Sequence, residues 1–243
     1  MRAILAACLA LLAGCAQLVP APDVPVPPEP ESAWQRVLER FVDEAGRVDY
    51  AGLARDPADL RGYVAWIHAR GIDRQPLAFH LNAYNALAMY NALERGVPES
   101  LGGFELLRFF VLRRFPLGGE PISLYAYEND VIRKIGDARV HFALNCMAMG
   151  CPRLPRTPFP AQELDAALER EARRFLNEPR NVQVDHPARS VRLSSYFRWY
   201  AEDFLAAAPT LIAYVNRYRG DPAPLDYRVE FLPYDWTLNA RTR

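Results

Sequence analysis

A histidine and two cysteines lie close together between positions 141 and 151, and these residue types can do covalent chemistry. A thiol becomes a nucleophile where a neighbouring imidazole or a helix N-terminus favours its thiolate form. The cluster therefore suggests a cysteine-dependent hydrolase or acyl-transferase that acts on peptide or amide bonds. In this hypothesis Cys151 or Cys146 is the nucleophile, His141 is the base, and Glu128 or Asn82 orients the histidine.

The same two cysteines also have non-catalytic interpretations. Two thiols five residues apart, delivered to an oxidising compartment, can close a disulfide or remain as a free structural pair. Geometry restricts the catalytic alternative. If the run is extended, His141 and Cys146 are about 16 Å apart and point to opposite faces. A bend at Asn145 would bring Cys146 round, and Cys151 can fold back because Gly150 permits a sharp turn.

Other candidate residues also have both structural and functional interpretations. A histidine on an apolar run is more often a satisfied core residue, and Asn82 and Asn85 are more often buried hydrogen-bonding residues than catalytic ones. The aromatic segment that contains Tyr196, Trp199 and Tyr200 can line a ligand groove or pack into the core.

The sequence motifs do not point to a metal or a cofactor. The sequence contains no HExxH or CxxC motif and no clustered Asp/Glu spacing that is typical of metal ligands. It also lacks a phosphate-binding loop and a dinucleotide fingerprint. We therefore expect neither a metal nor a cofactor.

The N-terminal residues predict a bacterial lipoprotein precursor. An arginine is followed by an apolar run, residues 3–13, that is too short to span a bilayer of roughly 30 Å. Leu12-Ala13-Gly14-Cys15 then fits the lipobox pattern, which predicts a signal peptide over 1–14 and lipid on Cys15. An ordinary secretory signal is the alternative. Ala16 follows the cysteine, so by resemblance to lipoproteins of two-membraned bacteria we expect anchoring on the periplasmic face of the outer membrane.

Residues 15–31 are expected to form a tether behind this anchor. Six prolines between positions 16 and 31 favour extended backbone of roughly 3 Å per residue. The chain is 51% hydrophobic, and residues 32–243 are long enough for one domain. Acidic and basic residues balance at 29 each, so we expect no nucleic-acid partner. The oligomeric state stays open.

Periodicity predicts the elements that position these residues. We expect helices over 32–42, 57–67, 77–93, 123–136, 164–176, 196–204 and 209–218, hairpins over 115–122 and 182–193, and strands over 140–144 and 228–232. Ser32 is expected to cap the first helix. The helix over 77–93 is apolar nearly all round, which predicts a central, buried position. The fold class is therefore α+β, a helix-rich single domain with a buried central helix and a small, mainly antiparallel sheet built from hairpins.

Several short blocks of sequence occur in an order that is typical of one family. They are Phe79 to Leu87, Gly118-Gly119, Ser123-Leu124, Glu128-Asn129, His141 to Cys146, Gly150-Cys151-Pro152, Leu193-Ser194-Ser195, Trp199-Tyr200 and Leu232 to Trp236. On these blocks the chain resembles the domain of unknown function 547 family, from about residue 30 to the C-terminus. His80 departs from the aromatic residue, such as Trp, that similar sequences lead us to expect. The resemblance implies a fold unit without an established activity.

These observations leave two hypotheses for function. Because no catalytic signature is complete, we favour a cell-envelope lipoprotein that is a non-catalytic binding or scaffold module. The alternative is the cysteine-dependent hydrolase or acyl-transferase described above. The expected partners are the membrane, through lipid on Cys15, and a peptide or cell-wall ligand.

Overall fold

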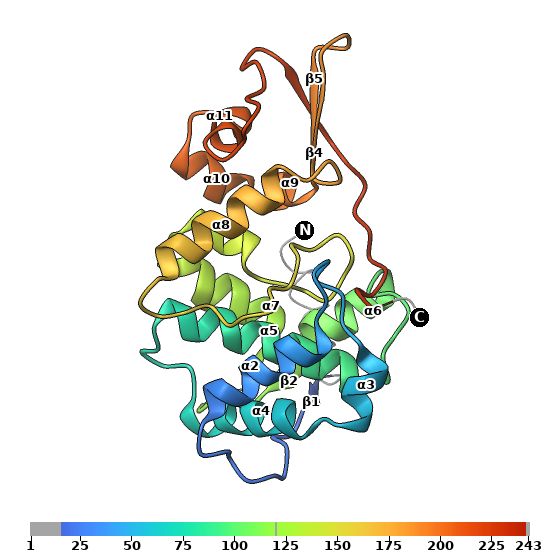
Figure 1. Ribbon diagram of the computed structural model, residues 1–243, viewed down its shortest axis with the longest axis vertical. Coiled ribbons are helices and arrows are strands. Elements are labelled where there is room, and N and C mark those ends of the chain that lie inside the picture. The colour runs from blue at the N-terminus through green and yellow to red at the C-terminus, as the bar shows by residue number, and fades with distance from the viewer. Residues whose placement is uncertain (1–15, 120, 242–243) are drawn as a thin grey trace, which may run out of the picture.

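The computed structural model describes residues 16–119 and 121–241, so the predicted signal peptide and Cys15 lie outside the described residues (Figure 1). The helices are α2 (Pro30–Phe41), α3 (Tyr50–Arg55), α4 (Ala58–Arg70), α5 (Leu77–Glu94), α6 (Phe104–Leu107), η1 (Arg108–Leu112), α7 (Leu124–Ala126), η2 (Tyr127–Ile132), η3 (Arg133–Ile135), η4 (Ala138–Phe142), α8 (Leu164–Leu176), α9 (Tyr196–Trp199), α10 (Ala201–Ala207) and α11 (Leu211–Asn216). The strands are β1 (Gln17–Leu18), β2 (Arg113–Phe115), β3 (Ile122–Ser123), β4 (Val182–Asp185), β5 (Ser190–Leu193) and β6 (Arg228–Phe231). These elements confirm the predicted α+β class.

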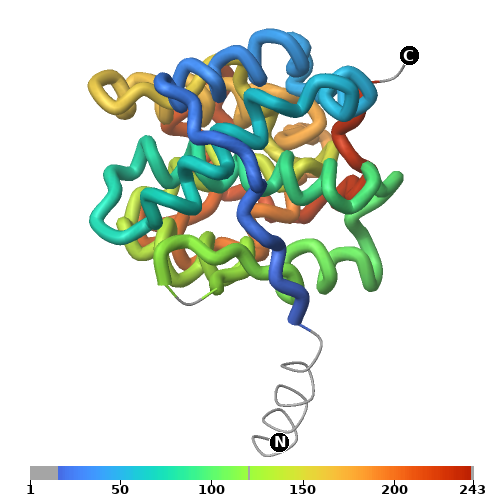
Figure 2. Tube along the Cα trace, turned by 90° about the horizontal axis from the view of Figure 1, so that it is seen from below, coloured from blue at the N-terminus to red at the C-terminus, as the bar shows by residue number. Residues whose placement is uncertain are grey.

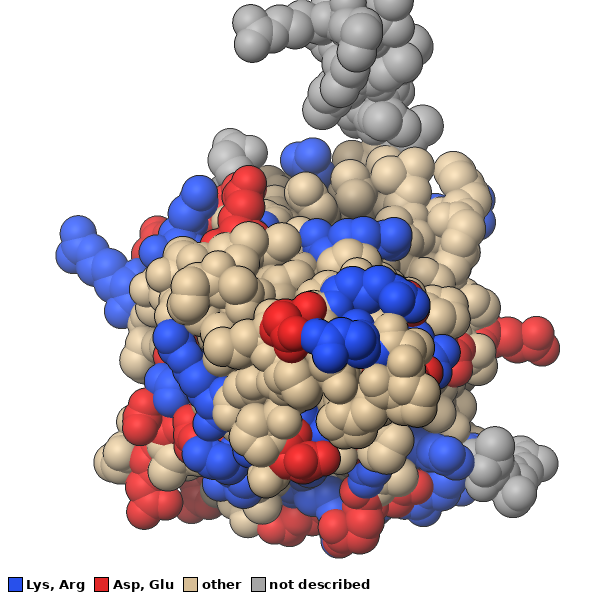
Figure 3. Space-filling model, turned by 90° about the horizontal axis from the view of Figure 1, so that it is seen from above, with Lys and Arg blue, Asp and Glu red and all other residues tan. Residues whose placement is uncertain are grey.

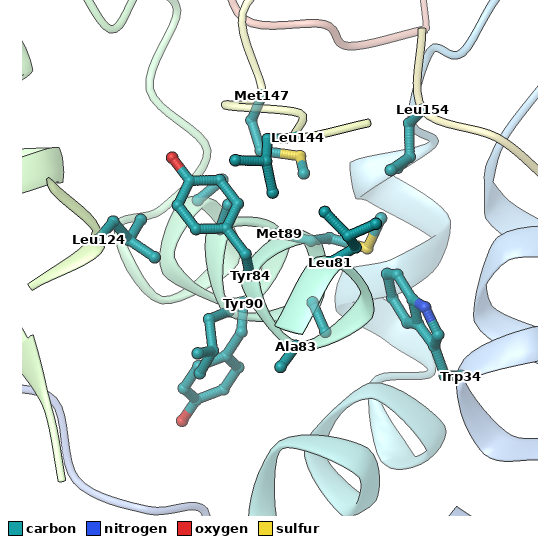
Figure 4. Close-up of a cluster of buried hydrophobic side chains, with 14 of the residues drawn as sticks. Trp34, Leu81, Ala83, Tyr84, Met89, Tyr90, Leu124, Leu144, Met147 and Leu154 are labelled. Atoms are coloured by element: carbon teal, nitrogen blue, oxygen red, sulfur yellow. The ribbon is translucent and has the colours of Figure 1, made fainter. Parts of the chain in front are cut away.

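Helix α5 is the buried centre of the fold, as its lack of a polar face predicts. Every side chain from Ala78 to Ala92 is buried. Figure 4 shows the packing around it, where Trp34 and Leu154 lie on one side of the helix, near Leu81. Burial on every side gives α5 a fixed position, and the other elements pack against it.

Three asparagines on α5 bind the backbone of surrounding segments. Asn85 donates a hydrogen bond to the carbonyl of Ala143 at 3.0 Å and accepts one from the N–H of Asn145 at 2.7 Å. Asn82 binds the backbone of Phe159 in the same way, whereas Asn91 donates to the carbonyl of Phe109 and accepts from the side chain of Arg113. These buried amides satisfy backbone groups that would otherwise lack partners, which is the structural role expected for them.

The core consists of two hydrophobic clusters. The first surrounds α5, and in it α2 packs on α4 with Trp34 stacked on Tyr63 at a centroid distance of 5.5 Å. The second lies in the upper half of Figure 1, where η4 packs against α8 and α10. Its centre is Phe142, whose ring lies 5.1 Å from Phe175 and 5.8 Å from Phe204.

The strands form two small mixed sheets, in the orders β1-β2-β3 and β4-β5-β6. Both predicted hairpins are present: Phe115 pairs with Ile122 in the first, and Val182 pairs with Leu193 in the second. β1 and β6 each add in parallel to one edge of a hairpin. The sheets are therefore mixed rather than mainly antiparallel, because strands from distant parts of the chain complete them.

The proline-rich N-terminal segment packs against the domain, as Figure 2 shows. β1 pairs with β2, and Val19 is 2% exposed and donates its N–H to the carbonyl of Arg114 at 2.8 Å. Farther along, Pro27 lies so close to Gly62 that an added Cβ there would be 3.0 Å from the proline ring. The described part of the segment expected as a semi-rigid tether, residues 16–31, therefore contacts the domain at these points. Composition indicates extended backbone but does not show the strand edge that binds it.

Two other local predictions are wrong. Residues 138–142 form the 3₁₀ helix η4 instead of the strand expected over 140–144, and Asp137 caps η4 by accepting a hydrogen bond from the N–H of Arg139. A short apolar run that is buried on all sides does not distinguish a strand from a helix. Helix α2 begins before Ser32, which therefore does not cap it, and α3 has no counterpart among the predicted elements.

The described surface carries both signs of charge. On the face seen in Figure 3, acidic and basic side chains lie interspersed, in keeping with their equal numbers in the sequence. Among residues 16–119 and 121–241, no helix is long and apolar enough to cross a membrane.

Candidate functional site

A pocket of about 490 Å³ lies where α5, the segment from α6 to η3, helix α9 and the C-terminal tail meet. Its volume is within the range of small-molecule sites. Side chains that line it include Tyr84 from α5, Glu128 and Arg133 from η2 and η3, and Tyr196, Trp199 and Tyr200 from α9 and its C-terminal end. The structure thus places all three predicted groove residues in one wall.

The wall on the side of α9 is a continuous aromatic surface. Trp199 stacks on Trp236 at a centroid distance of 5.7 Å and lies 4.8 Å from Tyr234. Tyr196 extends the surface, 5.8 Å from Tyr234. The tail that carries Trp236 is fixed by a backbone hydrogen bond of 2.8 Å from Leu101 to its carbonyl. Trp199 remains 40% exposed, so part of this aromatic surface is open to a ligand.

Glu128 places a carboxylate among these rings. The hydroxyl of Tyr84 donates to its Oε2 at 3.2 Å. Burial, and then the charge of Glu128, raises the pKa of Tyr84 and of Tyr200 well above the ordinary value. Both hydroxyls therefore keep their protons at neutral pH and can donate hydrogen bonds. Within the described residues, Glu128 forms no ion pair.

A second group of charged residues reaches the pocket: Arg133 and His141 line it, and Asp203 binds both of them from outside the lining. The guanidinium of Arg133 binds both carboxylate oxygens of Asp203, at 2.7 and 2.9 Å, and Nε2 of His141 lies 2.7 Å from Oδ2 of the same carboxylate. These contacts, the histidine hydrogen bond first, hold the pKa of Asp203 well below its usual range. Tyr200 stacks on the His141 ring at 3.9 Å. The histidine is thus fixed by a carboxylate at its edge and an aromatic ring on its face.

The two cysteines of the domain are joined to each other. Cys146 and Cys151 form a disulfide with their Cα atoms 6.1 Å apart. Cys146 is partly exposed and lines the pocket, whereas Cys151 is 2% exposed. The hydroxyl of Tyr234 lies 3.2 Å from each sulfur. The disulfide therefore forms part of the pocket wall.

The structure does not support the hydrolase hypothesis as the sequence suggests it. Neither Cys146 nor Cys151 is a free thiol, so neither is available as a nucleophile. His141 binds Asp203 through Nε2, and its Nδ1 has no hydrogen-bond partner within the described residues. Glu128 and Asn82 do not orient the histidine, because the former binds Tyr84 and the latter binds the backbone of residue 159. The catalytic arrangement proposed from the sequence is wrong.

Sequence reasoning also missed residues that the fold brings to the site. Asp203 lies 62 positions from His141, and Tyr234 lies 88 positions from Cys146. Tyr234 belongs to one of the sequence blocks that carry the family resemblance, and this was the available signal for it. Asp203 follows the Trp199-Tyr200 block closely, but its spacing from the histidine gives no local pattern.

Metal ligands do not cluster in the described part of the chain. Among these residues, no group of three or more His, Cys, Asp or Glu side chains is arranged to hold a metal ion.

A family model described as "Protein of unknown function, DUF547" matches residues 71–176, from just before α5 to the end of α8. The match contains Tyr84, Glu128 and Cys146, whereas the aromatic wall contributed by α9 and the tail lies beyond it. No curated protein and no solved structure matches the chain. The family description assigns no activity.

Proposed function

We propose that this chain is a cell-envelope lipoprotein whose domain binds a small cationic amine in the aromatic pocket. The observation that carries the proposal is Glu128, a carboxylate among aromatic rings that forms no ion pair within the described residues. A cation over aromatic faces gains about 0.5–2 kcal/mol from the ring quadrupoles, and this gain is largest where water is excluded. A neighbouring carboxylate adds direct attraction between opposite charges.

The charges around the pocket favour a cation over an anion. Arg133 brings one positive charge, but both oxygens of Asp203 bind its guanidinium. Glu128 then leaves one negative charge in excess among these three side chains. Glu128 is only partly exposed, so this charge acts at a lower effective dielectric constant than on an open surface. An amine that enters the pocket supplies the missing positive charge.

Tryptophan fluorescence can test this binding, because Trp199 and Trp236 line the pocket. Choline is a suitable probe, and 3,3-dimethylbutanol is its neutral counterpart of nearly the same shape. We expect choline to change the fluorescence in a saturable way and to bind at least about tenfold more tightly than the neutral alcohol, a difference of about 1.4 kcal/mol. Glu128→Gln keeps the shape of the side chain and the aromatic rings, and it should weaken that preference by removing the attraction of the carboxylate.

The matched control is Glu230→Gln on β6, which does not line the pocket and should leave choline binding unchanged. Equal affinity for choline and the alcohol would contradict the proposed ligand class. The same conclusion would follow if Glu128→Gln bound choline as tightly as the wild type.

The lipoprotein part of the proposal rests on the sequence that ends at Cys15. An apolar run of this length followed by a lipobox is typical of a precursor that is cleaved and lipidated at the cysteine. Labelled palmitate should enter the wild-type protein in bacterial cells and should not enter a Cys15→Ser variant. Wild-type protein that stays unlabelled would refute the anchor and would leave the pocket proposal untouched.

A further inference from the structure

The disulfide in the pocket wall has two sulfurs in different surroundings, and this asymmetry suggests a reaction. We propose that the Cys146–Cys151 disulfide exchanges with external thiols that enter the pocket, with Cys146 as the sulfur that is attacked and Cys151 as the sulfur that leaves. The ligand class is a small or protein-borne dithiol, or its disulfide in the reverse direction. The inference does not depend on the amine proposed above.

Access differs between the two sulfurs. Cys146 is partly exposed and lines the pocket of about 490 Å³. Cys151 is 2% exposed, and the separate cavity that it borders has a volume of only about 110 Å³. Exchange requires a thiolate to reach one sulfur of the bond, so access decides which sulfur is attacked. An external thiol therefore meets Cys146 first.

The surroundings of Cys151 suit a sulfur that leaves as a thiolate. The backbone N–H of Cys146 donates to its Sγ at 3.1 Å, and this contact sets the Cys151 sulfur apart. The hydroxyl of Tyr234 lies 3.2 Å from both sulfurs, so it can also donate to Cys151 when the bond breaks. Burial raises the pKa of Tyr234 well above its usual value, so this hydroxyl keeps its proton and can donate. Hydrogen bonds to a thiolate lower the pKa of the thiol, and a thiol of lower pKa leaves faster.

The loop between the cysteines is held in place by bonds other than the disulfide. The N–H of Met149 donates to the carbonyl of Thr237 at 2.7 Å, and that of Gly150 donates to the carbonyl of Asp235 at 2.8 Å. The side chain of Asn145 accepts a hydrogen bond from the N–H of residue 147 at 2.8 Å. A disulfide that closes so short a loop also constrains the unfolded chain less than one that closes a long loop. We therefore expect the reduced pair to stay folded and adjacent.

The exchange balances as follows. The external thiol ionises, and its thiolate attacks Sγ of Cys146 as the bond between the protein sulfurs breaks. The electron pair of that bond goes to Sγ of Cys151, which takes a proton from solvent in place of the one that the external thiol released. The second thiol of the dithiol then ionises and attacks the external sulfur of the mixed disulfide. The electron pair of that bond goes to Sγ of Cys146, which takes up a proton in place of the one released. Both cysteines become thiols, and the external dithiol becomes a disulfide.

Mass spectrometry of the full chain can follow this chemistry at single residues. Both cysteines lie in the tryptic peptide of residues 140–153, and fragmentation locates an adduct on either of them. We expect dithiothreitol to reduce the wild-type disulfide without denaturant, with the circular dichroism spectrum retained. With glutathione disulfide, a Cys151→Ser variant should form its adduct on Cys146 at least about tenfold faster than a Cys146→Ser variant forms its adduct on Cys151.

Tyr234→Phe tests the hydrogen bond to the leaving sulfur in protein that keeps both cysteines. It should slow reduction by dithiothreitol several-fold. The matched variant Tyr227→Phe also loses a hydrogen-bonded hydroxyl, but one that binds His186 outside the pocket, and it should not slow the reaction. This comparison stands even if a cysteine variant fails to fold. Reduction that needs denaturant, or that unfolds the chain, would overturn the proposal. Equal adduct rates on the two cysteines, or an unchanged rate in Tyr234→Phe, would overturn it as well.

Discussion

Replacing Asn85 by alanine removes the amide that holds the backbone just before Cys146. The side chain is 1% exposed, donates to the carbonyl of Ala143 at 3.0 Å and accepts from the N–H of Asn145 at 2.7 Å. Each buried group that loses its partner costs about 1–3 kcal/mol. With two such groups, the free energy of unfolding of Asn85→Ala should fall by about 2–6 kcal/mol. For a domain of this size, that corresponds to a decrease in Tm of about 4–24 °C.

Urea denaturation followed by circular dichroism measures this loss directly. The matched control is Gln183→Ala, which also removes a side-chain amide, but one whose single bond, to the carbonyl of Pro179, is at the surface. That variant should stay within about 0.5 kcal/mol of the wild type. If Asn85→Ala were as stable as the control, the buried amide would not support the loop, and our account of what positions Cys146 would fail.

Three further variants test the electrostatics and packing around the site and core. Burial lowers the pKa of His68 from 6.5 to about 4, so on acidification this histidine is protonated in the unfolded chain before it is protonated in the folded one. The free energy of unfolding of the wild type should therefore be highest above pH 6.5 and fall by about 3 kcal/mol toward pH 4. His68→Phe should flatten this dependence in urea titrations at several pH values. The hydrogen bond from His141 depresses the pKa of Asp203. Ionised Asp203 therefore stabilises the folded chain fully above the pKa of about 4 that it has in the unfolded chain, and this stabilisation is lost as pH falls through its pKa in the folded chain. Asp203→Asn should be destabilised at neutral pH and less acid-sensitive, as Tm at pH 7 and pH 3 would show. In Gly150→Ala the new Cβ would lie 2.7 Å from the ring of Tyr234, so pocket fluorescence should shift, and an unchanged spectrum would argue against this close contact.

Local sequence patterns predict the helices and hairpins whose structure depends on residues close together in the chain. The helix around Asn85 is central because its sequence has no polar face, and that feature is visible in one window of residues. The hairpin that pairs Val182 with Leu193 follows from alternating residues on both sides of a turn. The helix expected over 32–42 is present as α2, and its apolar residues at helical spacing, such as Trp34, are buried.

The contacts that local sequence patterns do not predict join residues that lie far apart in the chain. β1 joins a strand nearly a hundred positions away, and nothing in its proline-rich composition indicates that partner. The candidate site behaves in the same way. The sequence brings His141 and Cys146 together as neighbours, but the fold gives each a distant partner, Asp203 and Tyr234. The chemistry of the histidine and the cysteines therefore depends on residues that no local spacing identifies.

The pairing of β1 also bears on how the proposed lipoprotein would sit at a membrane. In the sequence, Ala16 alone separates Cys15 from β1, and one residue spans at most about 3.6 Å. A lipid on Cys15 would therefore be attached almost directly to a hydrogen-bonded sheet, with very little slack. Such an attachment restricts tumbling, so each copy would present nearly the same face to the bilayer. The position of β1 in the sheet, and not the length of a tether, would then set the height of the pocket above the lipid headgroups.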